Sequence, residues 1–124
     1  MPTDPEEVAR RCFQAYADSD RAAIEALIGD PFRFTSPLDN GLDRAAYLER
    51  CWPNHERVAG IEFVHLFHQG DCVFVTYEIR SRNGRCFRNS EVLTVRDGKL
   101  VEVEVYFGWN VPHDAPAGGW VEPE

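Results

Sequence analysis

Two dipeptides, Asn83-Gly84 and Asp97-Gly98, place the strongest constraint on the fold of this chain, because each lies between runs of β-branched and aromatic residues. Both are favoured centres of two-residue type I′ turns, in which both central residues need φ > 0. A two-residue turn fixes the pairing of its strands, so we expect Tyr77 opposite Ser90, and Ser90 opposite Val105. Because side chains alternate between the two faces of a strand, these pairings decide which side chains share a face of the sheet.

The pairings predict an inner sheet face that is mostly apolar and carries no carboxylate. Its members are Val73, Val75, Tyr77, Ile79, Arg88, Ser90, Val92, Thr94, Val101, Val103, Val105 and Phe107. Glu91, Glu102 and Glu104 are expected on the outer face, with Glu91 opposite Glu104, a pair of like charges that favours solvent or a cation. Finding Glu91 beneath the first helix would require a bulge or another turn type.

The same pairings leave apolar side chains on the outer face, where a monomer would expose them. These residues are Phe87, Leu93, Val95, Leu100 and Tyr106. Contiguous exposed apolar patches typically mark interaction sites. We therefore predict a homodimer built mainly on the outer face of the sheet.

Length, charge and hydropathy narrow the class of protein. The 124 residues fit a single domain over 1–124, and the net charge of −8 argues against general nucleic-acid binding, which needs clustered Lys and Arg. No apolar run approaches the roughly 20 residues of a membrane span, so no membrane partner is expected. Residues 1–7 hold neither the basic nor the apolar segment of a secretory signal, which predicts a cytoplasmic protein.

The sequence carries no signature of a cofactor or metal site. It contains no phosphate-binding loop, dinucleotide fingerprint or metal-ligand spacing. The cysteines, Cys12, Cys51, Cys72 and Cys86, lack a C-x-x-C spacing, so reduced and buried thiols are predicted. We expect chemistry that needs neither a cofactor nor a metal.

Helix signals precede most of the strand signals along the chain. Capping side chains and apolar spacing predict helices at 4–17, 20–28 and 43–52, and strands at 32–35 and 61–69 ahead of the two hairpins. Residues 36–41 are expected to form a loop, and 109–124 an irregular tail anchored by Val111 and Trp120. This order indicates an α+β fold, a curled antiparallel sheet wrapped around a long N-terminal helix with two shorter helices. Such a cone encloses a pocket.

Four segments resemble one superfamily. They are Tyr16-Ala17-Asp18-Ser19-Asp20, Phe34-Thr35-Ser36-Pro37, the Arg85-to-Val95 strand before Asp97-Gly98-Lys99, and Val105-Tyr106-Phe107-Gly108. Together they resemble the nuclear transport factor 2-like superfamily, whose cystatin-like cone fold includes SnoaL-like polyketide cyclases and ketosteroid isomerases. The resemblance spans nearly the whole chain and implies a cone-shaped pocket for a small hydrophobic ligand.

The resemblance also places the catalytic groups of ketosteroid isomerases on this sequence. Their helix tyrosine falls on Cys12, the aspartate before the proline that ends the first strand on Ser36, and the aspartate on the penultimate strand's inner face on Ser90. All three residues differ in type, so neither the base nor the donors to an enolate oxygen are expected at those positions. Efficient isomerisation of a ketosteroid is therefore not predicted.

Other side chains are candidates for acid, base or anion-binding roles. Asp39, in the expected pocket-mouth loop, is the first candidate acid or base, and a plain turn-forming role is the alternative. One of His65 and His68 should point inward, and whichever does can exchange a proton near neutral pH, although lone strand histidines are usually structural. Arg88 is placed under the sheet to bind an anion or pair with Asp39, unless it extends to solvent at the rim.

The ligand-binding residues expected around these groups are mostly aromatic. They are Tyr16, Tyr47, Trp52, Tyr77, Ser90, Phe107 and Trp109. The tyrosine hydroxyls would orient a carbonyl or stabilise an enolate oxygen, and the alternative is that they are core residues with satisfied hydroxyls.

Two classes of function fit these features. The first is a SnoaL-like enzyme that cyclises, isomerises or dehydrates a hydrophobic carbonyl compound by cofactor-independent proton transfer. The second is a non-catalytic ligand-binding or dimeric accessory module with the same pocket. Two titratable groups that converge on one point would favour the enzyme, whereas polar groups that do not converge would favour the binding module.

Overall fold

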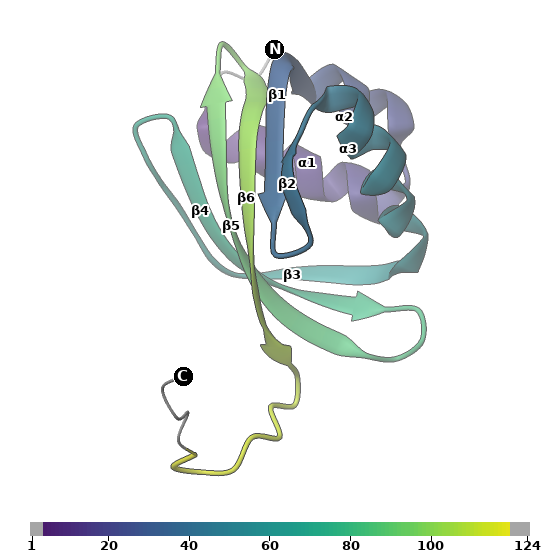
Figure 1. The fold of residues 1–124 in the computed structure, drawn as a ribbon, viewed down its shortest axis with the longest axis vertical. Helices are drawn as coiled ribbons and strands as arrows, with labels where there is room; N and C mark the ends of the chain where they lie inside the picture. Colours follow the sequence, from purple (N-terminus) through teal and green to yellow (C-terminus); the bar gives the residue numbers. More distant parts are fainter. Residues whose placement is uncertain (1–3, 120–124) are drawn as a thin grey trace.

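The structure, a computed structural model, describes residues 4–119 and has the predicted α+β architecture (Figure 1). Its elements, in chain order, are α1 (Pro5–Asp18), α2 (Arg21–Leu27), β1 (Ile28–Ser36), β2 (Asp39–Leu42), α3 (Arg44–Arg50), the 3-10 helix η1 (Trp52–Arg57), β3 (Val58–Gln69), β4 (Cys72–Ser81), β5 (Cys86–Arg96) and β6 (Lys99–Asn110). No helix in this part of the chain is long and apolar enough to cross a membrane.

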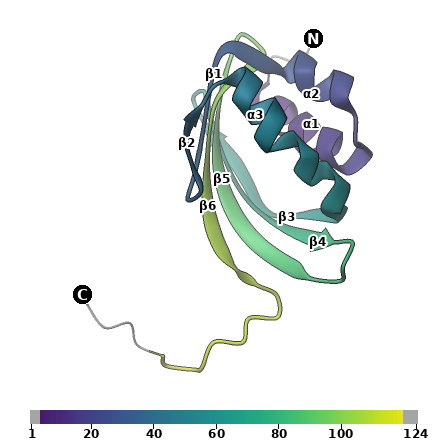
Figure 2. The same cartoon turned by 45° about the vertical axis from the view of Figure 1, so that its right-hand side comes forward.

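The strands form one curled sheet in the order β2-β1-β6-β5-β4-β3. Its concave face wraps around the helices (Figure 2), which confirms the predicted cone. The sheet is mixed rather than wholly antiparallel, because β1 runs parallel to β6. Residues Asp39–Leu42, which the sequence placed largely in a loop, pair with β1 as the short edge strand β2.

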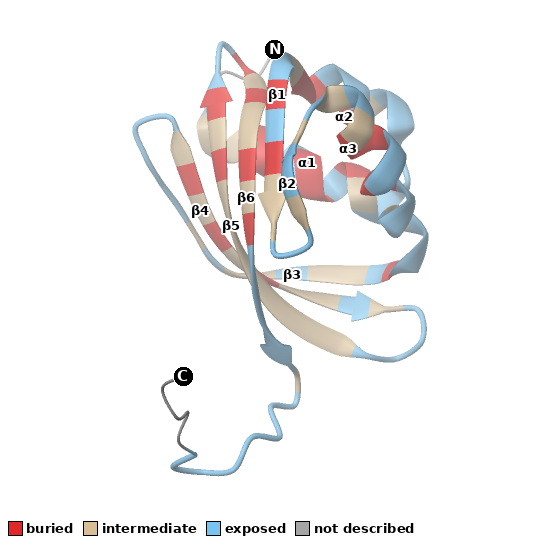
Figure 3. Cartoon of the chain, viewed as in Figure 1, coloured by how far each residue is buried: buried red, intermediate tan, exposed pale blue. Residues whose placement is uncertain are grey.

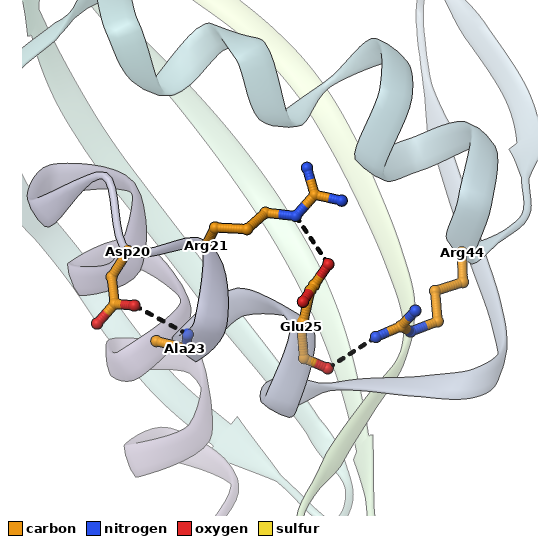
Figure 4. A network of polar contacts seen from close by, with 5 residues as sticks. All are labelled: Asp20, Arg21, Ala23, Glu25 and Arg44. Atoms are coloured by element: carbon orange, nitrogen blue, oxygen red, sulfur yellow. Dashed lines mark hydrogen bonds and ion pairs between the residues drawn. The ribbon is translucent and has the colours of Figure 1, made fainter.

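The short helix α2 is fixed at both ends by polar contacts (Figure 4). The Asp20 carboxylate accepts from the Ala23 N–H at 3.0 Å, the predicted N-cap. Arg21 pairs with Glu25 one turn later at 2.8 Å, and the Arg44 guanidinium donates to the Glu25 carbonyl at 2.9 Å. The last contact joins the start of α3 to α2.

The hairpin between β5 and β6 has the predicted turn. Asp97 and Gly98 have φ of 51° and 75°, as a type I′ turn requires, and Arg96 pairs with Lys99. The register then shifts by one residue, because Val95 pairs with Leu100 but Thr94 pairs with Glu102. This bulge was not predicted.

The hairpin between β4 and β5 has a different turn from the predicted one. Arg80 pairs with Cys86, and the Ser81 N–H donates to the Arg85 carbonyl at 2.7 Å, so the loop holds three residues, 82–84. Only Gly84 has a positive φ, of 89°. A three-residue loop that ends in a left-handed glycine is the next most common hairpin connection. Tyr77 therefore lies opposite Asn89 instead of Ser90.

This one-residue difference exchanges the two faces of β5. Leu93 and Val95 are buried on the inner face, and Asn89 and Glu91, half-buried on the same face, line the cavity described below. The prediction that placed Arg88, Ser90, Val92 and Thr94 inside was wrong, because the assumed turn was one residue too short. Val103 and Val105 on β6 are buried on the inner face as predicted, since the bulge in β6 offsets the longer loop.

The apolar patch predicted for a dimer interface is absent from the outer face. Leu93, Val95 and Leu100 are buried in the core, and Phe87 lines the cavity. Of the patch, Tyr106 alone is exposed, at 54%. The homodimer stays a prediction, but the exposed apolar patch no longer supports it.

Burial divides the sheet into two regions (Figure 3). Where the helices cover it, the strands are buried and form one core with α1, α2 and α3. Toward the β4–β5 hairpin and the end of β6 the strands are half-buried or exposed. β6 continues to Asn110, so Trp109 belongs to a strand and not to the predicted tail, and the Val111 N–H donates to the Cys86 carbonyl at 2.8 Å. Trp120 lies outside the described residues.

Candidate active site

A cavity of about 890 Å³ lies between the concave face of the sheet and the helices. Its wall is largely apolar and includes Phe13, Phe34, Ile61, Ile79, Phe87, Leu93, Val103, Val105, Phe107 and Trp109. Phe107 and Trp109 are about half exposed, at 53% and 49%, and stand at the open end. This is the volume and lining of a site for a small hydrophobic molecule.

Glu91 is the carboxylate on the inner face of β5, and it lines this cavity. Burial raises the pKa of its carboxyl group from 4.5 to about 7, and the hydroxyl of Tyr77 partly offsets this effect by donating to Oε1 at 3.1 Å. A carboxyl group with a pKa near 7 is divided between its acid and base forms at neutral pH. Glu91 is therefore suited to both halves of a proton transfer.

The Tyr77 hydroxyl, which donates to Glu91, has Asn89 as a second polar neighbour. The Gly108 N–H donates to Asn89 Oδ1 at 3.1 Å, and the Asn89 side chain lies near enough to Tyr77 to lower the pKa of its hydroxyl. Tyr77 has its pKa raised by burial and by Glu91, so it stays protonated and donates to the carboxylate. Tyr77 is thus the donor in the Tyr77–Glu91 pair.

A second polar pair, Tyr16 and Tyr47, lines the same cavity. The two hydroxyl oxygens are 2.5 Å apart, and burial raises both pKa values well above 10. One hydroxyl donates to the other, so the pair retains one further proton that it can donate to a ligand oxygen. The Tyr16 ring packs on Trp52 with 4.9 Å between the ring centroids, and the Tyr47 ring packs on Phe34 with 5.0 Å between the centroids.

Asp39, the carboxylate singled out from the sequence, also lines the cavity but is held by neighbours. Arg50 Nη2 lies 3.4 Å from its Oδ1, and the Ser36 hydroxyl donates to its Oδ2 at 3.3 Å. Arg50, and not Arg88, is thus its cationic partner.

The other predicted acid–base and anion-binding residues lie away from the cavity. His65 is exposed on the outer face of β3. His68 has the inward parity, but it is exposed at the end of the strand and pairs with Glu6 at 2.5 Å. Arg88 pairs with Glu78 across β4 and β5 on the outer face, with Nε 3.0 Å from the carboxylate.

The ligand-binding residues expected from the sequence separate into two groups. Tyr16, Tyr47, Tyr77, Phe107 and Trp109 line the cavity. Ser90 does not, because it faces outward and bonds to Thr76 at 2.8 Å. Trp52 is buried beneath Tyr16 and stacks on His55, so it supports the wall without reaching the cavity.

The corrected register also changes the comparison with ketosteroid isomerases. Cys12 and Ser36 line the cavity, as the resemblance placed them, but Glu91 replaces Ser90 as the acidic candidate on the inner face of the penultimate strand. Burial raises the pKa of the Cys12 thiol, which keeps it protonated near neutral pH. Two of the three positions thus depart from the isomerase pattern, and the third carries a carboxylate.

No group of three His, Cys, Asp or Glu side chains that could hold a metal occurs among residues 4–119. The titratable groups that share the cavity are carboxyl, phenol, thiol and guanidinium groups. Of these, the Tyr77–Glu91 and Tyr16–Tyr47 pairs come from β4, β5, α1 and α3, which only the folded chain brings together.

Solved structures similar to this one share the fold. An NTF-2 like protein of unknown function from Burkholderia xenovorans is 25% identical, with a TM-score of 0.73 over 97% of this chain and 94% of that one. IdmH, a putative polyketide cyclase from Streptomyces antibioticus, is 19% identical, with a TM-score of 0.69 over 82% and 90%. An epoxide hydrolase of M. tuberculosis, described as LEH-like, is 19% identical, with a TM-score of 0.69 over 86% and 84%.

The sequence comparisons are consistent with the structural ones. No significant match to a curated protein was found. The family model of the SnoaL-like domain matches residues 9–103, which extend from α1 into β6 and include both polar pairs of the cavity. The chain belongs to the SnoaL-like domain family.

Proposed function

We propose that this protein is an enzyme that moves a proton on a hydrophobic carbonyl compound without a cofactor, and that Glu91 is its acid–base group. The observation that carries the proposal is the position of Glu91, a carboxyl group with a pKa near 7 that lines an apolar cavity. A general acid–base group works best when its pKa is near the working pH.

The residues around Glu91 suit each half of the reaction. The Glu91 carboxylate removes a proton from the carbon next to the carbonyl, and the C–H electron pair moves into the enolate. A hydroxyl of the Tyr16–Tyr47 pair donates a hydrogen bond to the enolate oxygen, which carries the developing charge. The Glu91 carboxylic acid then returns the same proton to another atom of the substrate. The step is balanced without an oxidant or reductant.

Asp39 has a supporting role in this scheme. Its carboxylate already interacts with Arg50 and Ser36, whereas Glu91 has only the Tyr77 hydroxyl as its recorded partner among the described residues. The polyketide cyclase and epoxide hydrolase among the structural neighbours support small-molecule chemistry in general. They do not specify this reaction.

The proposal can be tested before the substrate is known, through exchange of carbon-bound hydrogen. We expect the protein to accelerate the exchange of the α-hydrogens of 2-tetralone or a related aryl ketone in D2O, followed by NMR. Replacing Glu91 by Gln should lower the exchange rate by about 10²-fold or more, the usual scale for loss of a general base. The wild-type rate should rise with pH through about 7, as the carboxyl group ionises.

The matched control is Glu104→Gln, because Glu104 lies on the outer face, where it accepts a hydrogen bond from Tyr106. This variant should keep the wild-type exchange rate. Equal exchange by Glu91→Gln and the wild type would contradict the role of Glu91. Binding of the ketones without accelerated exchange would instead favour the ligand-binding module.

A further inference from the structure

The cavity contains two arginines whose charge is not neutralised by an ion pair. Arg11, Arg21, Arg50 and Arg88 each pair with an acidic side chain. Arg57 and Arg82 line the cavity, and the ion pairs of residues 4–119 include neither of them. In a chain with a net charge of −8, two unpaired guanidinium groups at one cavity are a local positive centre.

Backbone contacts hold these two arginines together at the open end of the cavity. The Arg82 N–H donates to the Arg57 carbonyl at 2.9 Å, and Arg82 Nε donates to the Glu56 carbonyl at 2.8 Å. The second bond fixes the plane of the guanidinium group and leaves its two terminal amino groups for a ligand. Both side chains are exposed, and Glu56 is the one acidic residue beside them that lines the cavity.

The inner part of the cavity has the opposite electrostatic character. Glu91 becomes negative as it ionises, and the surrounding wall is apolar. An anionic group placed there would be desolvated beside a like charge, which is unfavourable. A ligand with an anionic end is therefore oriented with that end at Arg57 and Arg82 and its apolar part toward Glu91.

We propose that the substrate is an amphiphilic carboxylate, an apolar body whose carboxylate binds the guanidinium groups of Arg57 and Arg82 at the cavity mouth. Guanidinium groups recognise carboxylates with paired, charge-assisted hydrogen bonds. The placement of the reacting carbon near Glu91 rests on the proposed function, whereas the recognition of the carboxylate does not.

The test compares two ligands of nearly the same size and shape, of which only one is charged. 4-(2-Naphthyl)butanoate and its primary amide are titrated into the protein by calorimetry at low ionic strength. The wild type should bind the carboxylate about tenfold more tightly than the amide, and added salt should reduce this preference because it screens exposed charges. The Arg57→Gln/Arg82→Gln double variant should bind both ligands with the affinity of the amide.

Two controls separate charge from folding. Arg11→Gln removes an exposed arginine that pairs with Glu7 on α1 and should keep the tenfold preference. Unchanged binding of the amide to the double variant shows that its cavity is intact. Equal binding of both ligands to the wild type, no binding of either, or a preference that survives in the double variant would overturn the proposal.

A third variant distinguishes this proposal from the proposed function. Glu91→Gln should retain the carboxylate preference even where it has lost hydrogen exchange. A wild type that prefers the carboxylate but does not accelerate exchange would contradict the proposed function alone.

Discussion

The two hairpins that share β5 start from nearly the same sequence signal and end in different turns. Asp97-Gly98 forms the two-residue turn with both residues at positive φ, whereas at Asn83-Gly84 only Gly84 does so. The extra loop residue in the β4–β5 hairpin places Glu91 on the face of β5 that lines the cavity. The candidate acid–base group is thus a consequence of turn length and not of a catalytic motif.

The contacts of Arg82 differ from those of a two-residue turn. In a two-residue turn the Arg82 N–H would pair with the Arg85 carbonyl across the hairpin. Here it donates to Arg57 of η1 instead, and Ser81 takes the Arg85 carbonyl. The Asp97-Gly98 turn has no such recorded backbone contact to another element in the described chain. The longer turn thus combines a tertiary hydrogen bond to η1 with a local one from the Arg85 N–H to Asn83 Oδ1 at 3.0 Å.

The largest effect on stability is expected at the β-bulge in β6 where the pairing with β5 shifts by one residue. Gly108 is the bulged residue there, and a Cβ atom on it would clash with the Arg88 carbonyl oxygen. Gly108→Ala should lower the free energy of unfolding by about 3 kcal/mol, the upper range for overpacking. Urea denaturation measures this loss.

Gly70→Ala is the matched control for that substitution. Gly70 has a φ of 59° and open space around its Cβ position, so its replacement should cost only about 1 kcal/mol of backbone strain. Equal decreases in the free energy of unfolding of the two variants would show that the bulge at Gly108 does not constrain the β5–β6 hairpin.

An intermediate effect on the free energy of unfolding is expected from Glu91, whose carboxylate faces the cavity. Its pKa is raised from 4.5 to about 7, so the folded state binds more protons than the unfolded state between these values, and stability falls as pH rises through that window. Glu91→Gln removes the cost of burying the charge. At pH 8 the variant should be more stable than the wild type by on the order of 2 kcal/mol, and at pH 4 the two should be nearly equal.

Urea denaturation at several pH values follows this difference, with Glu104→Gln on the outer face as the control. That variant should track the wild type to within about 0.5 kcal/mol, as surface substitutions usually do. A Glu91→Gln curve parallel to the wild-type curve would mean that Glu91 is not buried as a charge.

The smallest effect tests the turns themselves by placing glycine at equivalent positions. Asp97→Gly should be neutral to within about 0.5 kcal/mol, because the φ of 51° there suits glycine. Asn83→Gly should destabilise by about 1 kcal/mol, because it adds backbone entropy to the unfolded chain and removes the bond from the Arg85 N–H to Asn83 Oδ1. Thermal unfolding of the two variants measures the contrast, and identical shifts would indicate identical turns.

Much of the fold could be predicted because its signals are local. Asp4, Asp20 and Asp43 accept hydrogen bonds from the first turns of α1, α2 and α3, and each cap is readable from its neighbours. The edge strand β2 was not predicted, because its residues include the turn formers Asp39, Asn40 and Gly41, and the parallel pairing of β1 with β6 was not predicted, because it leaves no turn signal between the strands.

The candidate site could be predicted only in part. Tyr16, Tyr47 and Tyr77 were correctly expected at the pocket, because helical spacing and the β4 alternation do not depend on a turn. Glu91 was missed and Arg88 misplaced, because a one-residue error in the loop reverses every side chain of β5. The signal that could have indicated the longer turn is the glycine at the end of the three-residue loop 82–84, because such loops commonly end in a left-handed glycine.

The sequence by itself determined the helices, the strands other than β2, the Asp97-Gly98 turn and the aromatic character of the pocket, because capping, periodicity and φ preferences act within a few residues. Tertiary structure decided the rest. The Asn83-Gly84 turn is one residue longer than its local pattern predicts and is bonded to Arg57 of η1, and its length decided which face of β5 looks into the cavity. The raised pKa of Glu91 arises because folding places its carboxyl group in an apolar cavity, where it loses part of its hydration, an environment that no local pattern encodes.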